Sequence, residues 1–214
     1  MQKYFLDNNS DKLILFFTGW GCDENQFVNL TTKSDLLLLY DYQNLDVEFD
    51  FSKYKDINIL AYSAGVFISS LFINRFLNIK QKVAINGNPY LFDENLGLTE
   101  SLVKEFKNIN LNNYLQFRRK YMVETNEEFE KYNKLQSLRS IESCLLELEN
   151  LQILYEKEKY NINPNFDKAI IAENDIIFKL EKQKKFYRNK IKIIPNSKHH
   201  IFFKFKTFEE ILDF

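Results

Sequence analysis

The sequence contains few cysteines, and nothing in it predicts a disulfide framework. Only two are present among 214 residues, Cys22 and Cys144, and they lie far apart in the chain. Their spacing is not that of paired metal ligands. We therefore expect free thiols, a reducing compartment such as the cytoplasm, and neither a metal ion nor another cofactor.

Long hydrophobic runs and an excess of one charge are also missing. The longest apolar runs, such as Leu36 to Tyr40, have the length of a strand rather than of a membrane span, and the N-terminus has no signal-peptide pattern. The 29 basic and 30 acidic residues nearly cancel, which argues against bulk binding to nucleic acid. The composition is that of a soluble globular protein. We expect neither a membrane nor a nucleic-acid partner.

Short apolar runs define the predicted fold. They lie at residues 13–17, 36–40, 57–62, 82–86, 168–172 and 190–194. Such runs are typical of strands buried on both faces of a parallel sheet that helices cover. Residues 90–163 are charged and have helical periodicity instead. The sequence predicts an α/β fold with a mostly parallel sheet, in which residues 1–89 and 164–214 form the core and residues 90–163 form a helical lid.

A serine lies at the junction between a predicted strand and a predicted helix. The run 57–62 leads into Ala61-Tyr62-Ser63-Ala64-Gly65, and helical spacing follows. A small-x-Ser-x-Gly sequence at such a junction is the nucleophile elbow of serine hydrolases, a turn so sharp that the residues two before and two after the serine must be small. Ala61 replaces the usual glycine, and a single methyl group is the mildest departure. The motif predicts that Ser63 is a nucleophile.

A serine nucleophile needs a histidine to accept its proton and an acid to orient that histidine. The chain has only two histidines, the adjacent His199 and His200, and both follow the nucleophile as in α/β-hydrolases. We favour His200, because the apolar residues 201–203 follow it in the way that apolar residues normally follow the catalytic histidine. His199 remains the alternative.

The expected acid lies in a loop after a late strand. Asp175 follows the run 168–172 in that position, and we choose it. The alternative is that Asp175 only caps the next helix, since aspartate is a favoured N-cap residue. Asp41, which also lies at the end of a strand, is the reserve candidate.

The third requirement is a pair of backbone N–H groups that stabilise an oxyanion. We expect one from Ala64, directly after the nucleophile, and the other from Trp20 in the Gly19-Trp20-Gly21 segment after the first predicted strand. Flanking glycines let the backbone approach the substrate closely, and the Trp20 ring would lie over the pocket. The alternative is a tight turn with a packed indole.

Basic residues gather in the predicted lid, where the arginines are Arg118, Arg119 and Arg139. A charge cluster on helices is usually a solvated face. The alternative is a docking surface for an acidic partner, because arginine suits phosphate and carboxylate groups.

Several segments together carry a resemblance to a known family. They are Leu15–Gly21, Tyr40–Leu45 with Asp50-Phe51-Ser52, Ala61–Val66, Ala84–Gly87 and His200–Phe205. On these segments the sequence resembles the BioG type of pimeloyl-[acyl-carrier-protein] methyl ester esterase, within the α/β-hydrolase superfamily. The Tyr-Asp-Tyr segment with the Asp-Phe-Ser that follows is the most particular part, and the likeness is weak across the lid.

The resemblance implies hydrolysis of the methyl ester of pimeloyl-acyl carrier protein, a late step in making the biotin precursor. The implied site residues are Ser63 as nucleophile, His200 as base, Asp175 as acid, and Trp20 and Ala64 in the oxyanion hole. The implied partner is the acyl carrier protein, which is acidic, so that a basic lid would attract it.

Two other functions stay open. Another acyl hydrolase, a thioesterase or a short-chain esterase, would use the same triad on a different acyl group. A non-catalytic hydrolase fold used for binding is the third hypothesis. It is disfavoured because all three residue types of the triad occur in the expected order.

Overall fold

The computed structural model describes residues 1–76 and 78–214, and within them seven strands form one sheet. The strands are β1 (Gln2–Leu6), β2 (Lys12–Phe17), β3 (Asp35–Tyr40), β4 (Asp56–Tyr62), β5 (Ile79–Ile85), β6 (Lys168–Ala172) and β7 (Ile191–Ile194). Their order across the sheet is β1-β3-β2-β4-β5-β6-β7, and every neighbouring pair except β1–β3 is parallel. The predicted α/β fold with a mostly parallel sheet is confirmed.

β1 is a strand that the sequence analysis did not predict. It pairs antiparallel with β3 at the edge of the sheet, with Gln2 opposite Tyr40. Four of its five residues are exposed. An exposed edge strand has no buried apolar run, which is the pattern that predicted the other strands.

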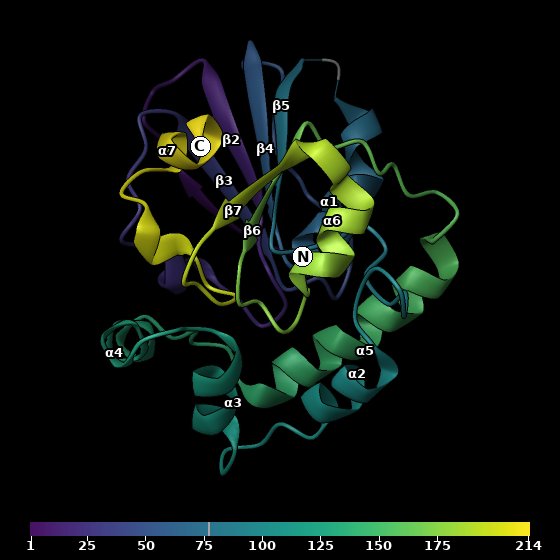
Figure 1. Ribbon diagram of the computed structural model, residues 1–214. Helices are drawn as coiled ribbons and strands as arrows, with labels where there is room; N and C mark the ends of the chain where they lie inside the picture. The colour runs from purple at the N-terminus through teal and green to yellow at the C-terminus, as the bar shows by residue number, and fades with distance from the viewer. Residues whose placement is uncertain (77) are drawn as a thin grey trace.

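Helices cover both faces of the sheet and one end of its strands. They are α1 (Ala64–Phe72), α2 (Glu100–Lys107), α3 (Tyr114–Tyr121), α4 (Asn126–Lys134), α5 (Ile141–Glu158), α6 (Leu180–Tyr187) and α7 (Phe208–Asp213). Short 3-10 helices lie at Glu24–Phe27, Ile73–Arg75, Arg188–Lys190 and Phe202–Lys204. Figure 1 shows α1 and α6 on one face of the sheet and α7 on the other, with α2 to α5 gathered beyond the ends of the strands.

Alternate residues of the central strands supply two apolar layers. In β2, Leu15 and Phe17 belong to the layer that includes α1, whereas Ile14 and Phe16 belong to the layer that includes α7. All four side chains are fully buried. Because successive side chains of a strand point to opposite faces, burial on both faces requires an unbroken apolar run. The two helical layers therefore explain the runs seen in the sequence.

Of the helices between β5 and β6, α2, α4 and α5 begin at side-chain caps, whereas α3 has no such cap. Thr125 and Glu128 form a capping box at the start of α4. The Thr125 side chain accepts a hydrogen bond from the Glu128 N–H, and the Glu128 side chain accepts one from the Thr125 N–H. Thr99 accepts a hydrogen bond from the Leu102 N–H at α2, and Ser140 caps α5 in the same way. These caps divide the segment into separate helices.

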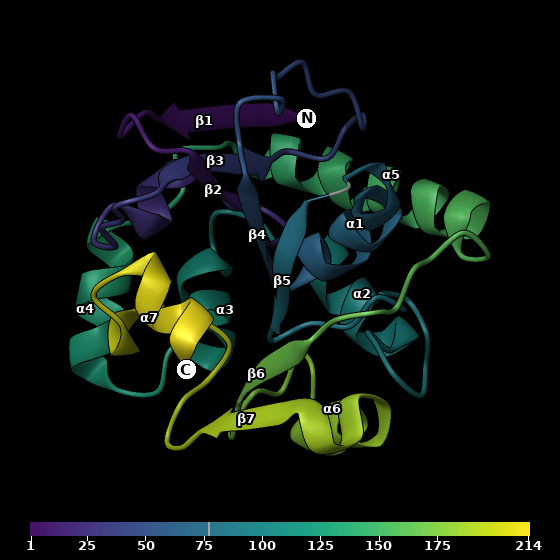
Figure 2. The same ribbon diagram turned by 90° about the horizontal axis from the view of Figure 1, so that it is seen from above.

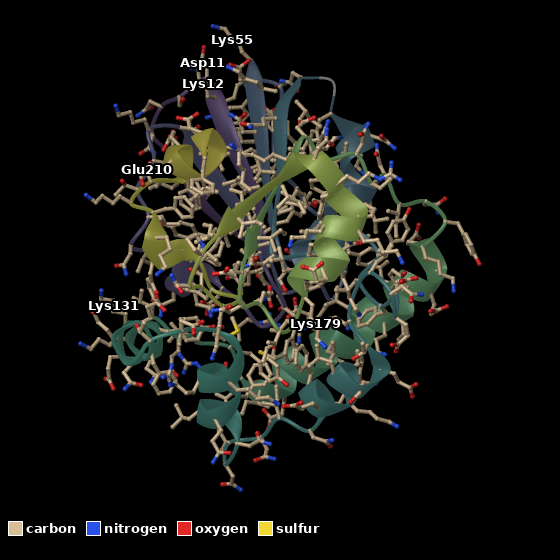
Figure 3. All side chains as sticks on the ribbon, in the orientation of Figure 1. Asp11, Lys12, Lys55, Lys131, Lys179 and Glu210 are labelled. Carbon is tan, nitrogen blue, oxygen red and sulfur yellow. The ribbon has the colours of Figure 1, made fainter. Side chains whose placement is uncertain are left out.

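The segment that holds α2 to α5 lies at the carboxyl ends of the parallel strands. Viewed from above, these helices surround the ends of β4 and β5 on several sides (Figure 2). Charged side chains such as Asp11, Lys55 and Lys131 point outward (Figure 3), and the Asp11–Lys55 ion pair lies at the opposite end of the sheet. Ligands of open parallel sheets bind at the carboxyl ends of the strands, so the helical segment covers the edge where a site is expected. The boundaries and the lid role of residues 90–163 stay predictions.

Among the described residues, no helix is both long enough and apolar enough to cross a membrane.

Candidate active site

Ser63 occupies a strained turn between β4 and α1. Its φ of 54° and ψ of −122° lie outside the regions that a residue with a side chain normally adopts. Backbone strain of this kind costs of the order of 1–3 kcal/mol and collects at functional sites. The Ser63 N–H donates to the Ile85 carbonyl at 2.9 Å, which ties the turn to the end of β5. The predicted elbow geometry is present.

Two glycines let neighbouring backbone segments approach this turn. A Cβ atom on Gly65 would lie 2.3 Å from the Phe17 carbonyl oxygen, and one on Gly87 would lie 2.5 Å from the Ser63 carbonyl oxygen. Both distances are too short for any side chain. The small residue required two positions after the serine therefore has a physical cause, the close packing of α1 on β2.

The side chains of Ser63, His199 and Asp175 form a continuous chain of contacts. The His199 Nε2 atom lies 2.9 Å from Ser63 Oγ, and its Nδ1 atom lies 2.8 Å from Asp175 Oδ2. The three residues are 8%, 3% and 3% exposed. A hydroxyl, an imidazole and a carboxylate in this order are the arrangement that activates a serine nucleophile.

The alternative that Asp175 caps the next helix is wrong, because the N-cap residue of α6 is Lys179. Asp175 contacts the turn before that helix and also His199. Its Oδ1 atom accepts hydrogen bonds from the backbone N–H groups of Ile177 at 2.8 Å and Phe178 at 3.1 Å, while Oδ2 faces His199. The turn and the imidazole thus use different oxygens of one carboxylate. The backbone contacts hold the carboxylate in place, which fixes the orientation of the imidazole.

The prediction of His200 for the position beside Ser63 is wrong, and His199 lies there instead. Adjacent side chains in a non-helical segment point in different directions, so one of the pair faces the serine and the other faces away. His200 packs among aromatic rings, with centroids 4.8 Å from both Tyr132 and Phe203. Burial lowers the pKa of His200 to about 3, and the neighbouring His199 acts in the same direction. The apolar residues after His200 reflect this packing rather than the position of the base.

Asn86 lies near Ser63, His199 and Asp175, and the sequence analysis did not identify it as a site residue. Its side-chain amide donates to the His199 carbonyl at 2.6 Å and accepts from the Ala172 N–H at 2.7 Å. It is fully buried and has a φ of 43°, a conformation that asparagine tolerates better than most residues. Asn86 therefore links the histidine loop to the end of β6, just before the Asp175 turn. Its place at the end of a parallel strand is the signal that could have identified it.

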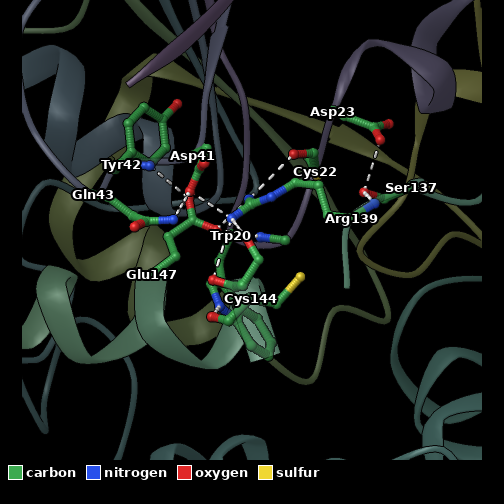
Figure 4. A network of polar contacts seen from close by, with 12 residues as sticks. Trp20, Cys22, Asp23, Asp41, Tyr42, Gln43, Ser137, Arg139, Cys144 and Glu147 are labelled. Carbon is green, nitrogen blue, oxygen red and sulfur yellow. Dashed lines mark hydrogen bonds and ion pairs between the residues drawn. The ribbon is translucent and has the colours of Figure 1, made fainter. Parts of the chain in front are cut away.

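Asp41, the reserve acid, belongs to a different cluster. Its Oδ1 atom lies 2.6 Å from Nη2 of Arg139, whose Nη1 atom lies 2.6 Å from Oε2 of the fully buried Glu147 (Figure 4). The reserve candidate thus faces an arginine, while the histidine beside Ser63 faces Asp175.

Two of the three arginines predicted for docking are buried in polar contacts. Arg139 is held by Asp41 and Glu147, so its charge is already paired. Arg118 is 2% exposed and donates to the Tyr132 carbonyl at 2.8 Å near the end of α4. Neither side chain belongs to a solvated face or is free to meet an acidic partner, so for Arg118 and Arg139 both the solvated-face interpretation and the docking alternative are wrong. Arg119 is half-buried and donates to Asn126 at 2.8 Å, and its docking role stays a prediction.

The residues predicted for an oxyanion hole lie beside Ser63. A Cβ atom built on Gly19 would lie 3.1 Å from the Ser63 Cβ atom, so the loop after β2 lies against Ser63. Ala64 is the first residue of α1, where backbone N–H groups have no partner within the helix. The Trp20 ring stacks on Phe106 at 5.3 Å and donates from Nε1 to the Cys144 carbonyl. The N–H roles of Trp20 and Ala64 stay predictions.

A pocket opens from Ser63 and His199 into the helical segment. Its wall includes Gly19, Trp20 and Ala64 together with apolar side chains such as Phe106 of α2 and Leu148 of α5. Ser63 thus lines a mainly apolar space, which suits an acyl chain better than a charged group. In the described residues, no three histidine, cysteine, aspartate or glutamate side chains gather into a group that could hold a metal ion.

Comparisons with known proteins agree with this geometry. A family model described as pimeloyl-ACP methyl esterase BioG matches residues 1–211. The crystal structure of BioG from Haemophilus influenzae superposes with a TM-score of 0.86 and 27% identity, covering 98% of this chain and 99% of that one. A lipase-esterase related protein from Clostridium acetobutylicum, 19% identical with a TM-score of 0.64 over 92% of each chain, shares the fold.

A further relative differs from this chain in length. A malonyl-[acyl-carrier protein] O-methyltransferase from Bacteroides fragilis is 31% identical over 182 residues. The match covers 82% of this chain but only 36% of the methyltransferase.

Proposed function

The chain belongs to the BioG family of pimeloyl-ACP methyl esterases, and from this we propose that it hydrolyses the methyl ester of pimeloyl-acyl carrier protein with Ser63 as nucleophile. The observation that carries the mechanism is the continuous contact from Ser63 through His199 to Asp175. The apolar pocket supports an acyl substrate. The α/β-hydrolase fold alone would leave the substrate open.

In the proposed first step, Ser63 Oγ attacks the ester carbonyl carbon while its proton passes to His199 Nε2. Asp175 accepts a hydrogen bond from His199 Nδ1–H and stabilises the imidazolium that forms. The tetrahedral intermediate carries its negative charge on the former carbonyl oxygen, where the N–H groups of Trp20 and Ala64 would stabilise it. Its collapse breaks the bond to the methoxy oxygen, which leaves as methanol with the proton from His199.

The second step returns the enzyme to its starting state. His199 takes a proton from a water molecule, whose oxygen attacks the acyl carbon bound to Ser63. Collapse of the second intermediate releases the free carboxyl group of the pimeloyl chain and returns the proton to Ser63 Oγ. One ester bond and one water molecule are consumed, and one acid and one methanol are formed.

The proposed partner is the acyl carrier protein, and the proposed location is the cytoplasm. The family supports the partner, and the methyltransferase relative is named for a reaction on another carrier-bound acyl group. The two free thiols, Cys22 and Cys144, support a reducing compartment.

Mass spectrometry of the carrier protein tests the proposal. Pimeloyl-acyl carrier protein methyl ester is incubated with the wild type and with Ser63→Ala, and the mass of the carrier is followed. We expect conversion of methyl ester to free acid by the wild type only, with the acyl chain still attached to the carrier. Release of the whole acyl chain would show a thioesterase instead. An unchanged carrier, under conditions where short-chain esters are cleaved, would contradict the proposed substrate.

A further inference from the structure

The loop from Gly19 to Cys22, which lies beside Ser63, is held by groups from the helical segment. Trp20 Nε1 donates to the Cys144 carbonyl at 2.5 Å, and the Gly21 N–H donates to Glu147 Oε2 at 2.9 Å. Nη1 of Arg139 donates to the Cys22 carbonyl at 3.4 Å. Three successive residues of the loop are thus attached to α5 or to the turn before it (Figure 4).

Glu147 is the centre of these contacts. Its Oε1 atom accepts from the Tyr42 N–H at 3.0 Å, and its Oε2 atom accepts from the Gly21 N–H and from Arg139. Arg139 in turn contacts Asp41, which directly follows the neighbouring strand β3. One carboxylate therefore joins the loops after β2 and β3 to helix α5.

Stability alone does not explain a buried ion pair at this place. Removing two charges from water costs several kcal/mol, and apolar residues of similar volume often stabilise a protein as well or better. What an ion pair adds is direction, because each N–H and each carboxylate oxygen must meet its partner at a fixed distance and angle. Here these contacts fix the position of the loop that contains Trp20.

We propose that Glu147 and Arg139 are positioning residues that hold the Gly19–Cys22 loop so that the Trp20 N–H points at the oxyanion. The inference rests on the proposed function, since it requires a serine hydrolase with an oxyanion at Ser63. The Gly21 N–H bond to Glu147 fixes the peptide that follows Trp20, and Gly21 has a φ of 71° that lets the chain turn there. Oxyanion donors act only within a narrow range of distance, so a shifted loop loses transition-state stabilisation without losing substrate binding.

The variant Glu147→Gln tests the inference, because it keeps the shape of the side chain but leaves only one acceptor oxygen for two backbone N–H groups. We expect kcat for ester hydrolysis to fall about 10- to 100-fold, less than the 10²–10³-fold typical of deleting an oxyanion donor outright. KM is expected to change less than threefold. A trifluoromethyl ketone with an aliphatic chain, which forms an oxyanion adduct with the serine, should lose affinity by the same factor as kcat/KM.

Two controls separate positioning from general destabilisation. Glu149→Gln makes the same chemical change at an exposed position of α5 and should leave every parameter unchanged. Ile211→Ala removes buried contacts in α7, outside the polar contacts that hold the loop, and should lower the melting temperature without changing kcat or ketone affinity. Arg139→Lys should weaken ketone affinity in the same direction as Glu147→Gln.

The possible failures are distinguishable. Absence of ester hydrolysis by the wild type would overturn the proposed function and, with it, this inference. If the wild type hydrolyses the ester and Glu147→Gln stays within twofold of it in kcat and ketone affinity, the inference is overturned. The proposed function would still hold. If Ile211→Ala had the same melting temperature as Glu147→Gln and lost kcat and ketone affinity to the same extent, the inference would also be overturned.

Discussion

The Nε2 atom of His199 lies 2.9 Å from the Oγ atom of Ser63, although the two residues are 136 positions apart in the chain. The serine follows β4 and the histidine follows β7, and both strands belong to the same sheet. The sheet brings their carboxyl ends to one edge, which faces the helices α2 to α5 at the bottom of Figure 1. This contact is the basis of the first predictions.

Ser63→Ala is expected to lower kcat by at least 10³-fold, because it removes the atom that attacks the ester, and residual catalysis then comes from binding and the oxyanion hole alone. The fold should not change, since the substitution removes one oxygen atom from a nearly buried site. Rates and far-ultraviolet circular dichroism of the purified variant check both statements. Retained turnover in a folded variant would contradict the mechanism.

A matched pair of variants distinguishes the two histidines. His199→Phe should lower kcat by at least 10³-fold, because the serine then has no base. His200→Phe should change kcat less than tenfold, because its ring packs among aromatic side chains and, within the described chain, its Nε2 atom has no hydrogen-bond partner. Steady-state kinetics of both variants decide the matter. The opposite order of effects would show that the contacts of His199 are not those of the active enzyme.

The same residue, His200, should make stability depend on pH. Its folded-state pKa of about 3 lies below the ordinary value of 6.5, so the unfolded chain binds an additional proton between these two values. Stability from this group is therefore complete above about pH 6.5 and is lost as the pH falls towards 3. The loss approaches roughly 1 kcal/mol per pH unit.

Urea unfolding between pH 4.5 and 7.5 measures this effect. The free energy of unfolding of the wild type should fall more steeply with acidification than that of His200→Phe, which has no imidazole to protonate. The carboxylates contribute equally to both proteins and cancel in the comparison. Parallel pH profiles would mean that His200 titrates alike in the folded and unfolded chains.

Asp175→Asn should lower kcat by about 10²- to 10⁴-fold, because an amide can stabilise the wrong imidazole tautomer and cannot stabilise an imidazolium. The amide oxygen of the substituted side chain could still accept the hydrogen bonds that Oδ1 receives from Ile177 and Phe178, so the turn should persist. Melting temperature and kcat, measured together, separate these effects. A loss of folding with no specific loss of kcat per folded molecule would indicate that stabilising the turn is the only role of Asp175.

Gly65→Ala is expected to destabilise the protein by about 3 kcal/mol or more, since overpacking against rigid atoms forces the backbone to move. The new Cβ atom would lie 2.3 Å from the Phe17 carbonyl oxygen and 2.4 Å from that of Thr18. In Gly19→Ala the nearest atoms are side-chain atoms at 3.1 Å, so the loss of stability should be smaller. Urea unfolding of the two variants gives the comparison, and equal losses would contradict the packing argument.

The sequence was sufficient for the features that depend on local order along the chain. Short runs rich in apolar residues predicted six of the strands in the described residues. Burial on both faces accounts for the unbroken runs of central strands such as β2, whereas two of the four residues of β7 are exposed. The small residues around Ser63 predicted its turn, because close backbone contact admits only small side chains. β1 was missed because an exposed edge strand has no such pattern.

The tertiary structure decided which side chains meet. His199 and His200 have nearly the same local sequence context, and only the path of the loop, tied to Asn86 and the helical segment, turns one ring to Ser63 and buries the other. Arg139 resembled a surface charge until Asp41, 98 positions away, was seen to pair with it. Periodicity and turn chemistry act over a few residues and are written in the sequence, whereas pairing of charges and the choice between adjacent side chains depend on distances that only the folded chain sets.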